Sequence, residues 1–247
     1  MEHFKEYSKY YNLLYKDKNY IAETEYILNI IKKYNENATK LLDIGCGTGI
    51  HANELSKKGF LVTGMDISNT MLSVAKETYN NIDFVLGDIR DFKLQSKFSI
   101  ITSLFHVMSY QSTNLDLINA FSSVNKHLEE GGYFIFDCWY GPGVKNDAPK
   151  VRVKRFEDEN LKVLRIAEPI EDENLNIIDV NFDVFIIDKS NNTVSNLKEL
   201  HRMRYLFQTE VELLCEKFNL KVIDCFKWMT FDQPSVNDWY ATFIIKK

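Results

Sequence analysis

The chain has 247 residues, which is enough for one large hydrophobic core or two small ones. Apolar residues make up 45% of it, charged residues 26%, and the net charge is −5. This acidic balance argues against nucleic acid as a partner. The N-terminus has no basic region followed by an apolar run, and no apolar stretch is long enough to span a bilayer. We therefore expect a cytoplasmic protein with no membrane partner.

The cysteines give no sign of a metal site or a disulfide framework. They are widely spread and form no Cys-x-x-Cys pair. We expect buried free thiols and no bound metal. The four residues are Cys46, Cys138, Cys215 and Cys225.

Strand-like and helix-like patterns alternate through the first 138 residues. Short apolar runs predict strands, and apolar residues at helical spacing predict the helices between them. This alternation favours a parallel sheet with helices on both faces. The predicted strands are 40–44, 60–66, 82–86, 98–105 and 133–137, and the predicted helices are 19–35, 50–58, 68–79 and 113–129.

The second half changes character. Three long segments alternate between apolar and polar residues and are rich in β-formers, which predicts antiparallel strands added to the first unit. A helix and two final strands follow. The added strands are 150–166, 175–188 and 193–207, the helix is 209–218, and the final strands are 220–231 and 238–246.

A glycine-rich turn follows the first predicted strand, in the sequence Leu42-Asp43-Ile44-Gly45-Cys46-Gly47-Thr48-Gly49. Glycine suits a turn in which the backbone approaches a ligand closely or takes a positive φ. Ligands of open α/β sheets bind at this carboxyl edge. A dinucleotide fingerprint would need a glycine or alanine at Ile50, and no Gly-Lys-Ser/Thr follows for a phosphate loop.

Two acidic residues end the next two strands. Asp66 lies 21 residues after Gly45, where a carboxylate can accept hydrogen bonds from both hydroxyls of a ribose. The alternative is a turn or helix-capping aspartate, with Ser68 as the N-cap of the following helix. Asp88 could accept from the amino group of an adenine while the Ile89 N–H donates to the ring, although Gly-Asp also marks ordinary turns.

These residues resemble the class I S-adenosylmethionine-dependent methyltransferases over residues 41–138. The family's acidic-x-G-x-G-x-G loop is matched by Asp43, Gly45, Gly47 and Gly49. The resemblance implies a Rossmann-like, doubly wound sheet of seven strands ending in a hairpin, S-adenosylmethionine as methyl donor, and no catalytic metal. The cofactor-binding residues it implies are Asp43, Gly45, Cys46, Gly47, Gly49, Asp66, Ile67, Met71, Asp88, Ile89 and Leu104.

A second resemblance is to the N,N-dimethyltransferases of nucleotide-linked amino sugars. It is carried by Leu104–Tyr110, by Tyr10–Leu14, by Asp137–Tyr140 and by His201-Arg202 with Leu206-Phe207. That subfamily ends the first of these runs in Gly-His, with the histidine near the acceptor amine, where this chain has Ser109-Tyr110. Tyrosine is a poor base at neutral pH, so the identity of the base stays open, as does N- against O-methylation.

The remaining acceptor-site candidates each have a structural alternative. His106 is either a proton acceptor near the methyl group or a hydrogen-bonded structural histidine. Tyr11 is either part of an aromatic lid or, with Tyr10 and Tyr15, one face of a short helix. Arg202 and Arg204 share a strand face that suits a diphosphate or, alternatively, solvent and acids such as Glu199. The predicted catalytic residues are His106, Tyr110 and Tyr11, and the predicted substrate-binding residues are Tyr11, Trp139, Tyr140, Arg202 and Arg204.

The sequence therefore predicts a methyltransferase with a small-molecule acceptor, favouring an amino group of a nucleotide-linked sugar. Two alternatives stay open: an N- or O-methyltransferase for another metabolite, such as glycine or a quinone precursor, and a cofactor-binding scaffold without catalysis. The expected organisation is an N-terminal helical lid at 1–36, a core at 37–145 and 208–247, and an antiparallel insertion at 146–207 that lines the acceptor site. Either a monomer or a homodimer is compatible with it.

Overall fold

The computed structural model describes Leu14 and residues 18–247. They form two compact units. The larger unit contains Asn19–Asp147 and Tyr205–Lys247, and the smaller contains Ala148–Arg204 together with Leu14 and Lys18. Among the described residues, no helix is both long enough and apolar enough to cross a membrane.

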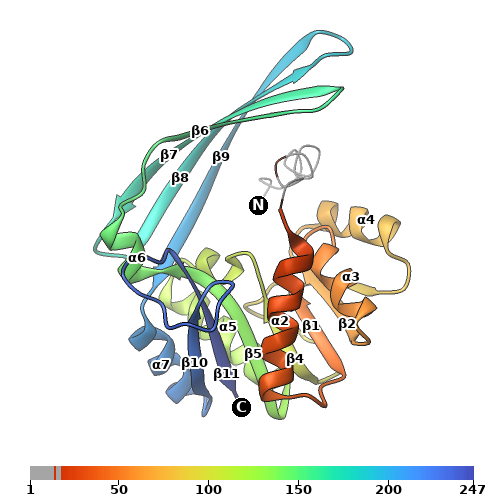
Figure 1. The fold of residues 1–247 in the computed structure, drawn as a ribbon, viewed down its shortest axis with the longest axis vertical. Helices are drawn as coiled ribbons and strands as arrows, with labels where there is room; N and C mark the ends of the chain where they lie inside the picture. The colour runs from red at the N-terminus through yellow and green to blue at the C-terminus, as the bar shows by residue number, and fades with distance from the viewer. Residues whose placement is uncertain (1–13, 15–17) are drawn as a thin grey trace. The chain divides into compact units, whose positions relative to one another are not determined.

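The larger unit is built on a sheet with the strand order β3-β2-β1-β4-β5-β11-β10 (Figure 1). Strands β1 to β5 run parallel, and β11 is antiparallel to both β5 and β10. This confirms the predicted doubly wound sheet and its final hairpin. The strands are β1 Lys40–Ile44, β2 Leu61–Asp66, β3 Asp83–Leu86, β4 Phe98–Ser103, β5 Leu128–Tyr140, β10 Lys221–Lys227 and β11 Tyr240–Lys246.

Helices cover both faces of this sheet, which explains why strands such as β1 read as continuous apolar runs. Leu41 packs into a core formed with α2, α3 and α4, whereas Leu42 and Ile44 point the other way, into a core formed with α5 and α7. Alternating side chains of one strand therefore enter two separate cores. The helices are α2 Tyr20–Tyr34, α3 Ile50–Lys57, α4 Asn69–Thr78, α5 Asn114–His127, α6 Gly141–Asn146 and α7 Gln208–Lys217.

Local capping fixes where two of these helices begin. The hydroxyl of Ser68 accepts from the Met71 N–H at the start of α4, as expected for an N-cap. Thr113 and Asp116 form a reciprocal capping box at the start of α5. Both helices follow parallel strands, so their caps set the course of the chain just beyond the carboxyl edge of the sheet.

Two strand ends differ from the sequence prediction for backbone reasons. Strand β4 ends at Ser103, because Phe105 and His106 take positive φ values of 65° and 64°. Strand β5 begins at Leu128 instead of residue 133. Strand β5 includes Gly131, which has φ 76°. The pairing of β5 with β4 shifts register in this region.

The smaller unit is an antiparallel meander in the order β6-β7-β8-β9. The strand predicted over 150–166 is split into β6 and β7, because the Asp158 carboxylate accepts from the backbone N–H groups of Asn160 and Leu161 and closes a turn. The last two residues of β9 pair with β5. The strands are β6 Arg152–Glu157, β7 Leu161–Asp172, β8 Ile177–Asp188 and β9 Thr193–Leu206.

Candidate functional site

The glycine loop joins β1 to α3 and is held against the end of β2. The backbone N–H groups of Gly45 and Cys46 both donate to the Met65 carbonyl, at 2.7 and 3.0 Å. Gly45 has φ 75°, and a Cβ built there would lie 2.4 Å from the Val107 side chain. Gly47 has φ 55°, and a Cβ there would meet no atom within 4 Å. The loop is thus packed closely at Gly45 and open at Gly47.

Asp66, at the end of β2, connects this loop to the next helix. One carboxylate oxygen accepts from the Gly47 N–H and the other from the Ser68 N–H, each at 2.8 Å. Each oxygen keeps a second lone pair, so the group can still accept two hydroxyl donors. Burial raises the pKa of Asp66, against the lowering effect of its backbone hydrogen bonds. Glycine loop and acid therefore meet where the sequence predicts a ribose site.

The apolar residues predicted for the cofactor site differ in their exposure. Ile67, next to Asp66, is 41% exposed, whereas Cys46, Met71, Ile89 and Leu104 are buried. All four cysteines of the chain are free and buried, and burial raises the pKa of the Cys46 thiol well above its ordinary value. Ile67 can therefore offer an apolar surface to a ligand, whereas the other four side chains expose little surface.

The carboxylate of Asp88 is largely occupied by Arg90. It accepts from the Arg90 backbone N–H at 3.0 Å and from its Nε and Nη2 atoms at 2.5 to 3.0 Å. Burial alone would raise the pKa of Asp88, but these hydrogen bonds outweigh it and lower that pKa. Arg90 also contacts Asp116 at 3.1 Å. The predicted adenine contact at Asp88 thus competes with an internal ion pair.

Asp43 lies inside the sheet, only 2% exposed, and accepts a 2.9 Å hydrogen bond from the Thr102 hydroxyl of β4. The strand order reverses between β1 and β4, which is where open α/β sheets leave a crevice for ligands. Asp43 and Thr102 therefore lie at the predicted position of the site. Thr102 was not singled out by the sequence.

The turn after β4 brings His106 against Asp137 of β5. His106 Nδ1 lies 2.5 Å from Asp137 Oδ2, and the His106 backbone N–H donates to both carboxylate oxygens at 3.2 Å. The His106 ring stacks on Tyr240 of β11, with centroids 4.5 Å apart. Neither Asp137 nor Tyr240 is assigned a role by the sequence patterns. Asp137 could have been noticed as a candidate site residue, because it is a single acid at the end of an otherwise apolar strand.

The neighbouring aromatic candidates have different surroundings. Tyr110 ends the 3-10 helix η1 (Val107–Tyr110) and is 37% exposed. Trp139 is half-buried, and its backbone N–H donates to the buried Ser109 hydroxyl at 2.9 Å. Tyr140 packs in the core with 9% exposed, and burial raises its pKa. Tyr110 and Trp139 thus keep exposed surface, which Tyr140 largely lacks.

The two arginines predicted for a diphosphate belong to different environments of the smaller unit. Arg202 is exposed and contacts Asp179 on the neighbouring strand at 3.0 Å, whereas Arg204 is 9% exposed. Glu199, the partner suggested by the sequence, lies 3.3 Å from His201. Arg202 therefore has an acidic neighbour that an incoming phosphate would have to displace.

Tyr11, with Tyr10 and Tyr15, lies outside the described residues, so its predicted lid and catalytic roles stay predictions. Within Leu14 and residues 18–247, no group of three or more His, Cys, Asp or Glu side chains is placed to hold a metal ion.

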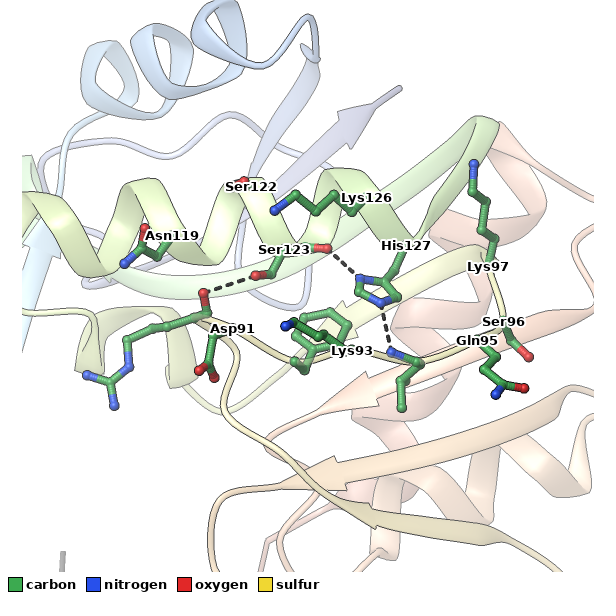
Figure 2. Close-up of a pocket in the computed structure, with 13 residues that line it drawn as sticks. Asp91, Lys93, Gln95, Ser96, Lys97, Asn119, Ser122, Ser123, Lys126 and His127 are labelled. Carbon is green, nitrogen blue, oxygen red and sulfur yellow. Dashed lines mark hydrogen bonds between the residues drawn. The ribbon is translucent and has the colours of Figure 1, made fainter.

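A separate pocket of about 430 Å³ lies between the segment 90–97 and helix α5 (Figure 2). None of the predicted site residues lines it. Its histidine, His127, has both ring nitrogens engaged: Nε2 accepts from the Leu94 N–H at 3.0 Å, and Nδ1 donates to the Ser123 carbonyl at 2.7 Å. These bonds fix α5 to the 90–97 segment, so this histidine is structural.

Comparison with known families identifies the region around the glycine loop. The profile described as "Methyltransferase domain" matches residues 41–132. A dTDP-3-amino-3,4,6-trideoxy-alpha-D-glucopyranose N,N-dimethyltransferase of Streptomyces venezuelae is 29% identical, over 86% of this chain and 89% of the relative. A dTDP-3-amino-3,6-dideoxy-alpha-D-glucopyranose N,N-dimethyltransferase of Streptomyces fradiae is 27% identical, over 84% and 80%.

Solved structures share the fold over nearly the whole chain. DesVI of Streptomyces venezuelae has a TM-score of 0.81 and 26% identity, and the match covers 95% of both chains. An S-adenosylmethionine-dependent methyltransferase of Clostridium acetobutylicum has a TM-score of 0.82 and 23% identity, over 96% of this chain and 95% of the other. The likeness therefore extends far beyond residues 41–132.

Proposed function

Since the chain is an S-adenosylmethionine-dependent methyltransferase, we propose that its methyl acceptor is an amino group on a nucleotide-linked sugar. The observation that carries this proposal is the length of the similarity. The two relatives named as N,N-dimethyltransferases of dTDP-linked amino sugars match 84–86% of the chain, well beyond the 41–132 domain. A minimal methyltransferase would not need the β6–β9 meander, which these matches reach into.

The cofactor is assigned to the glycine loop and Asp66. The two lone pairs that Asp66 keeps after bonding Gly47 and Ser68 suit the two hydroxyls of a ribose. The open space at Gly47 lets a ligand approach the backbone, and Ile67 offers an apolar contact beside it. When bound, S-adenosylmethionine supplies a methyl group on a positively charged sulfur, whose thioether product is a good leaving group. The residues present thus suit the cofactor.

The contribution of the protein to the reaction is mainly positional. The acceptor nitrogen must lie in line behind the methyl carbon, with its lone pair free and water excluded. The turn that carries His106 packs its Val107 side chain directly against Gly45 of the cofactor loop. That turn therefore borders the place where cofactor and acceptor would meet.

The glycine loop gives a test of the cofactor position. Gly47 and Gly59 both have positive φ, and a Cβ at either meets no atom within 4 Å. Gly47→Ala and Gly59→Ala should each cost about 1 kcal/mol of stability, from backbone strain alone. Only Gly47→Ala should weaken S-adenosylmethionine binding, by about tenfold or more, because its methyl group would fill the ligand's space. Urea unfolding and calorimetry measure the two effects, and equal affinities in both variants would contradict the assignment.

Acceptor class is tested by binding to protein saturated with the demethylated cofactor, S-adenosylhomocysteine. Calorimetry would compare a dTDP-linked amino sugar, the matching dTDP-linked hydroxyl sugar, the free amino sugar, and glycine. We expect the amino sugar nucleotide to bind most tightly, since both its nucleotide and its amine are recognised. Tighter binding of the hydroxyl sugar nucleotide would instead favour O-methylation, in line with Tyr110 at the position of the subfamily's histidine.

A further inference from the structure

His106 and Asp137 form a buried contact between neighbouring parts of the carboxyl edge. Asp137 is fully buried in β5, whereas the His106 side chain keeps 17% of its surface exposed. Nδ1 is the buried nitrogen, 2.5 Å from the carboxylate. The contact between Nδ1 and the carboxylate does not have the angles of a hydrogen bond. Hydrogen bonds of catalytic groups are often poorly aligned before substrate binds. Nε2 is therefore the ring nitrogen left to face an acceptor.

The backbone that carries His106 is strained. Phe105 and His106 are consecutive non-glycine residues with φ near +65°, a left-handed conformation that residues with a Cβ rarely adopt. The His106 N–H bonds to both Asp137 oxygens, so the same carboxylate stabilises the turn and contacts the ring. Strain of this kind persists where surrounding interactions enforce it, and it is concentrated at active sites.

Two titratable groups near Asp137 stay neutral at physiological pH. Burial raises the pKa of Tyr26 on α2 to about 12, and it raises that of Cys138 on β5 well above its ordinary value. Asp137 contributes electrostatically to both shifts. Tyr240 on β11 stacks on the imidazole with an interplanar angle of 10°. The imidazole thus stacks on an aromatic ring and has its Nδ1 beside a carboxylate.

We infer that Asp137 is a positioning residue that keeps the His106 proton on Nδ1, so that Nε2 accepts a proton from the acceptor amine. This inference rests on the proposed function. An ammonium acceptor has no lone pair. When its N–H bond breaks, the electron pair stays on nitrogen, and the proton passes to Nε2 and then to water. The imidazolium formed in between is stabilised by the Asp137 carboxylate, as in a serine-protease triad. His106 would thus act as the base in this chain, which has Tyr110 at the position of the subfamily's histidine.

The variants are His106→Gln, Asp137→Asn and the double variant, with Asp224→Asn as the matched control. Asp224 is a half-exposed acid on β10 that contacts Tyr34 and Lys33. An amide at position 137 can still accept from the His106 N–H, but it would donate to Nδ1 and so move the ring proton to Nε2. Each single variant should lower kcat by about 100-fold. The double variant should be no slower than His106→Gln, because Asp137 acts through the ring.

Two readouts separate this role from simple structural support. Nitrogen-15 NMR of labelled histidine should show the Nδ1–H tautomer of His106 in the wild type and the Nε2–H tautomer in Asp137→Asn. Calorimetry should show S-adenosylmethionine affinity unchanged in both single variants. The acid limb of the kcat profile should be present in the wild type and lost in His106→Gln.

Three results would overturn the inference: an unchanged tautomer in Asp137→Asn, an acid limb retained by His106→Gln, or a double variant whose losses multiply. The proposed function fails separately, if the wild type methylates no nucleotide-linked amino sugar. The same variants are then assayed on the acceptor that does react, and the tautomer measurement needs no acceptor.

Discussion

Replacing Asp66 by alanine is expected to weaken S-adenosylmethionine binding by about 2–3 kcal/mol, which is about 30- to 150-fold in Kd. The carboxylate would lose two charge-assisted hydrogen bonds to the ribose, and the Gly47 N–H would lose the acceptor that holds the loop in place. Calorimetry with S-adenosylmethionine and with S-adenosylhomocysteine measures the change. Asp83→Ala, an exposed acid at the start of β3, is the matched control.

The same carboxylate should make binding depend on pH. The ribose hydroxyls of a bound cofactor would donate to the ionised form of Asp66, and burial raises the pKa of Asp66. Affinity should therefore be complete above that raised pKa and should fall as the pH drops through it. Asp66→Asn should lack this acid-side loss. Wild-type affinity that stays constant on acidification, or unchanged affinity in Asp66→Ala, would remove Asp66 from the cofactor site.

Replacing Gly45 by alanine should destabilise the larger unit by about 3 kcal/mol. Part of this cost is backbone strain at φ 75°, and the rest is overpacking of the new methyl group against Val107, 2.4 Å away. A valine side chain is short and stiff, so it cannot move aside cheaply. Unfolding in urea measures the loss.

Shortening Val107 should rescue part of it. In a Val107→Ala background the clash is relieved, and Gly45→Ala should cost only the strain, about 1–2 kcal/mol. The difference between the two costs is the coupling energy of loop and turn. If Gly45→Ala lowers the unfolding free energy equally in both backgrounds, Gly45 and Val107 are not in contact.

The glycine loop and Asp66 were predictable, because a sharp turn needs glycine at fixed positions and the parallel sheet brings the ends of β1 and β2 to the same edge. The partnership of His106 with Asp137 was not. It joins residues 31 apart in the chain and depends on a left-handed turn at two non-glycine residues, which no spacing rule favours. The Arg202–Asp179 pair was not predictable either, because it depends on the register of β8 and β9. The turn between β6 and β7 could have been predicted, because Asp158 is a residue type that closes turns through its side chain.

The proposed reaction moves a methyl group from S-adenosylmethionine to the amine of a nucleotide-linked sugar. The most direct test incubates the wild-type protein with isotope-labelled S-adenosylmethionine and a pair of dTDP-linked sugars that differ only in an amino or a hydroxyl group at one carbon. Tandem mass spectrometry then locates the label. We expect labelled methyl groups on the sugar nitrogen and none on the hydroxyl partner. Label on the hydroxyl sugar alone, or transfer only to a free metabolite such as glycine, would contradict it.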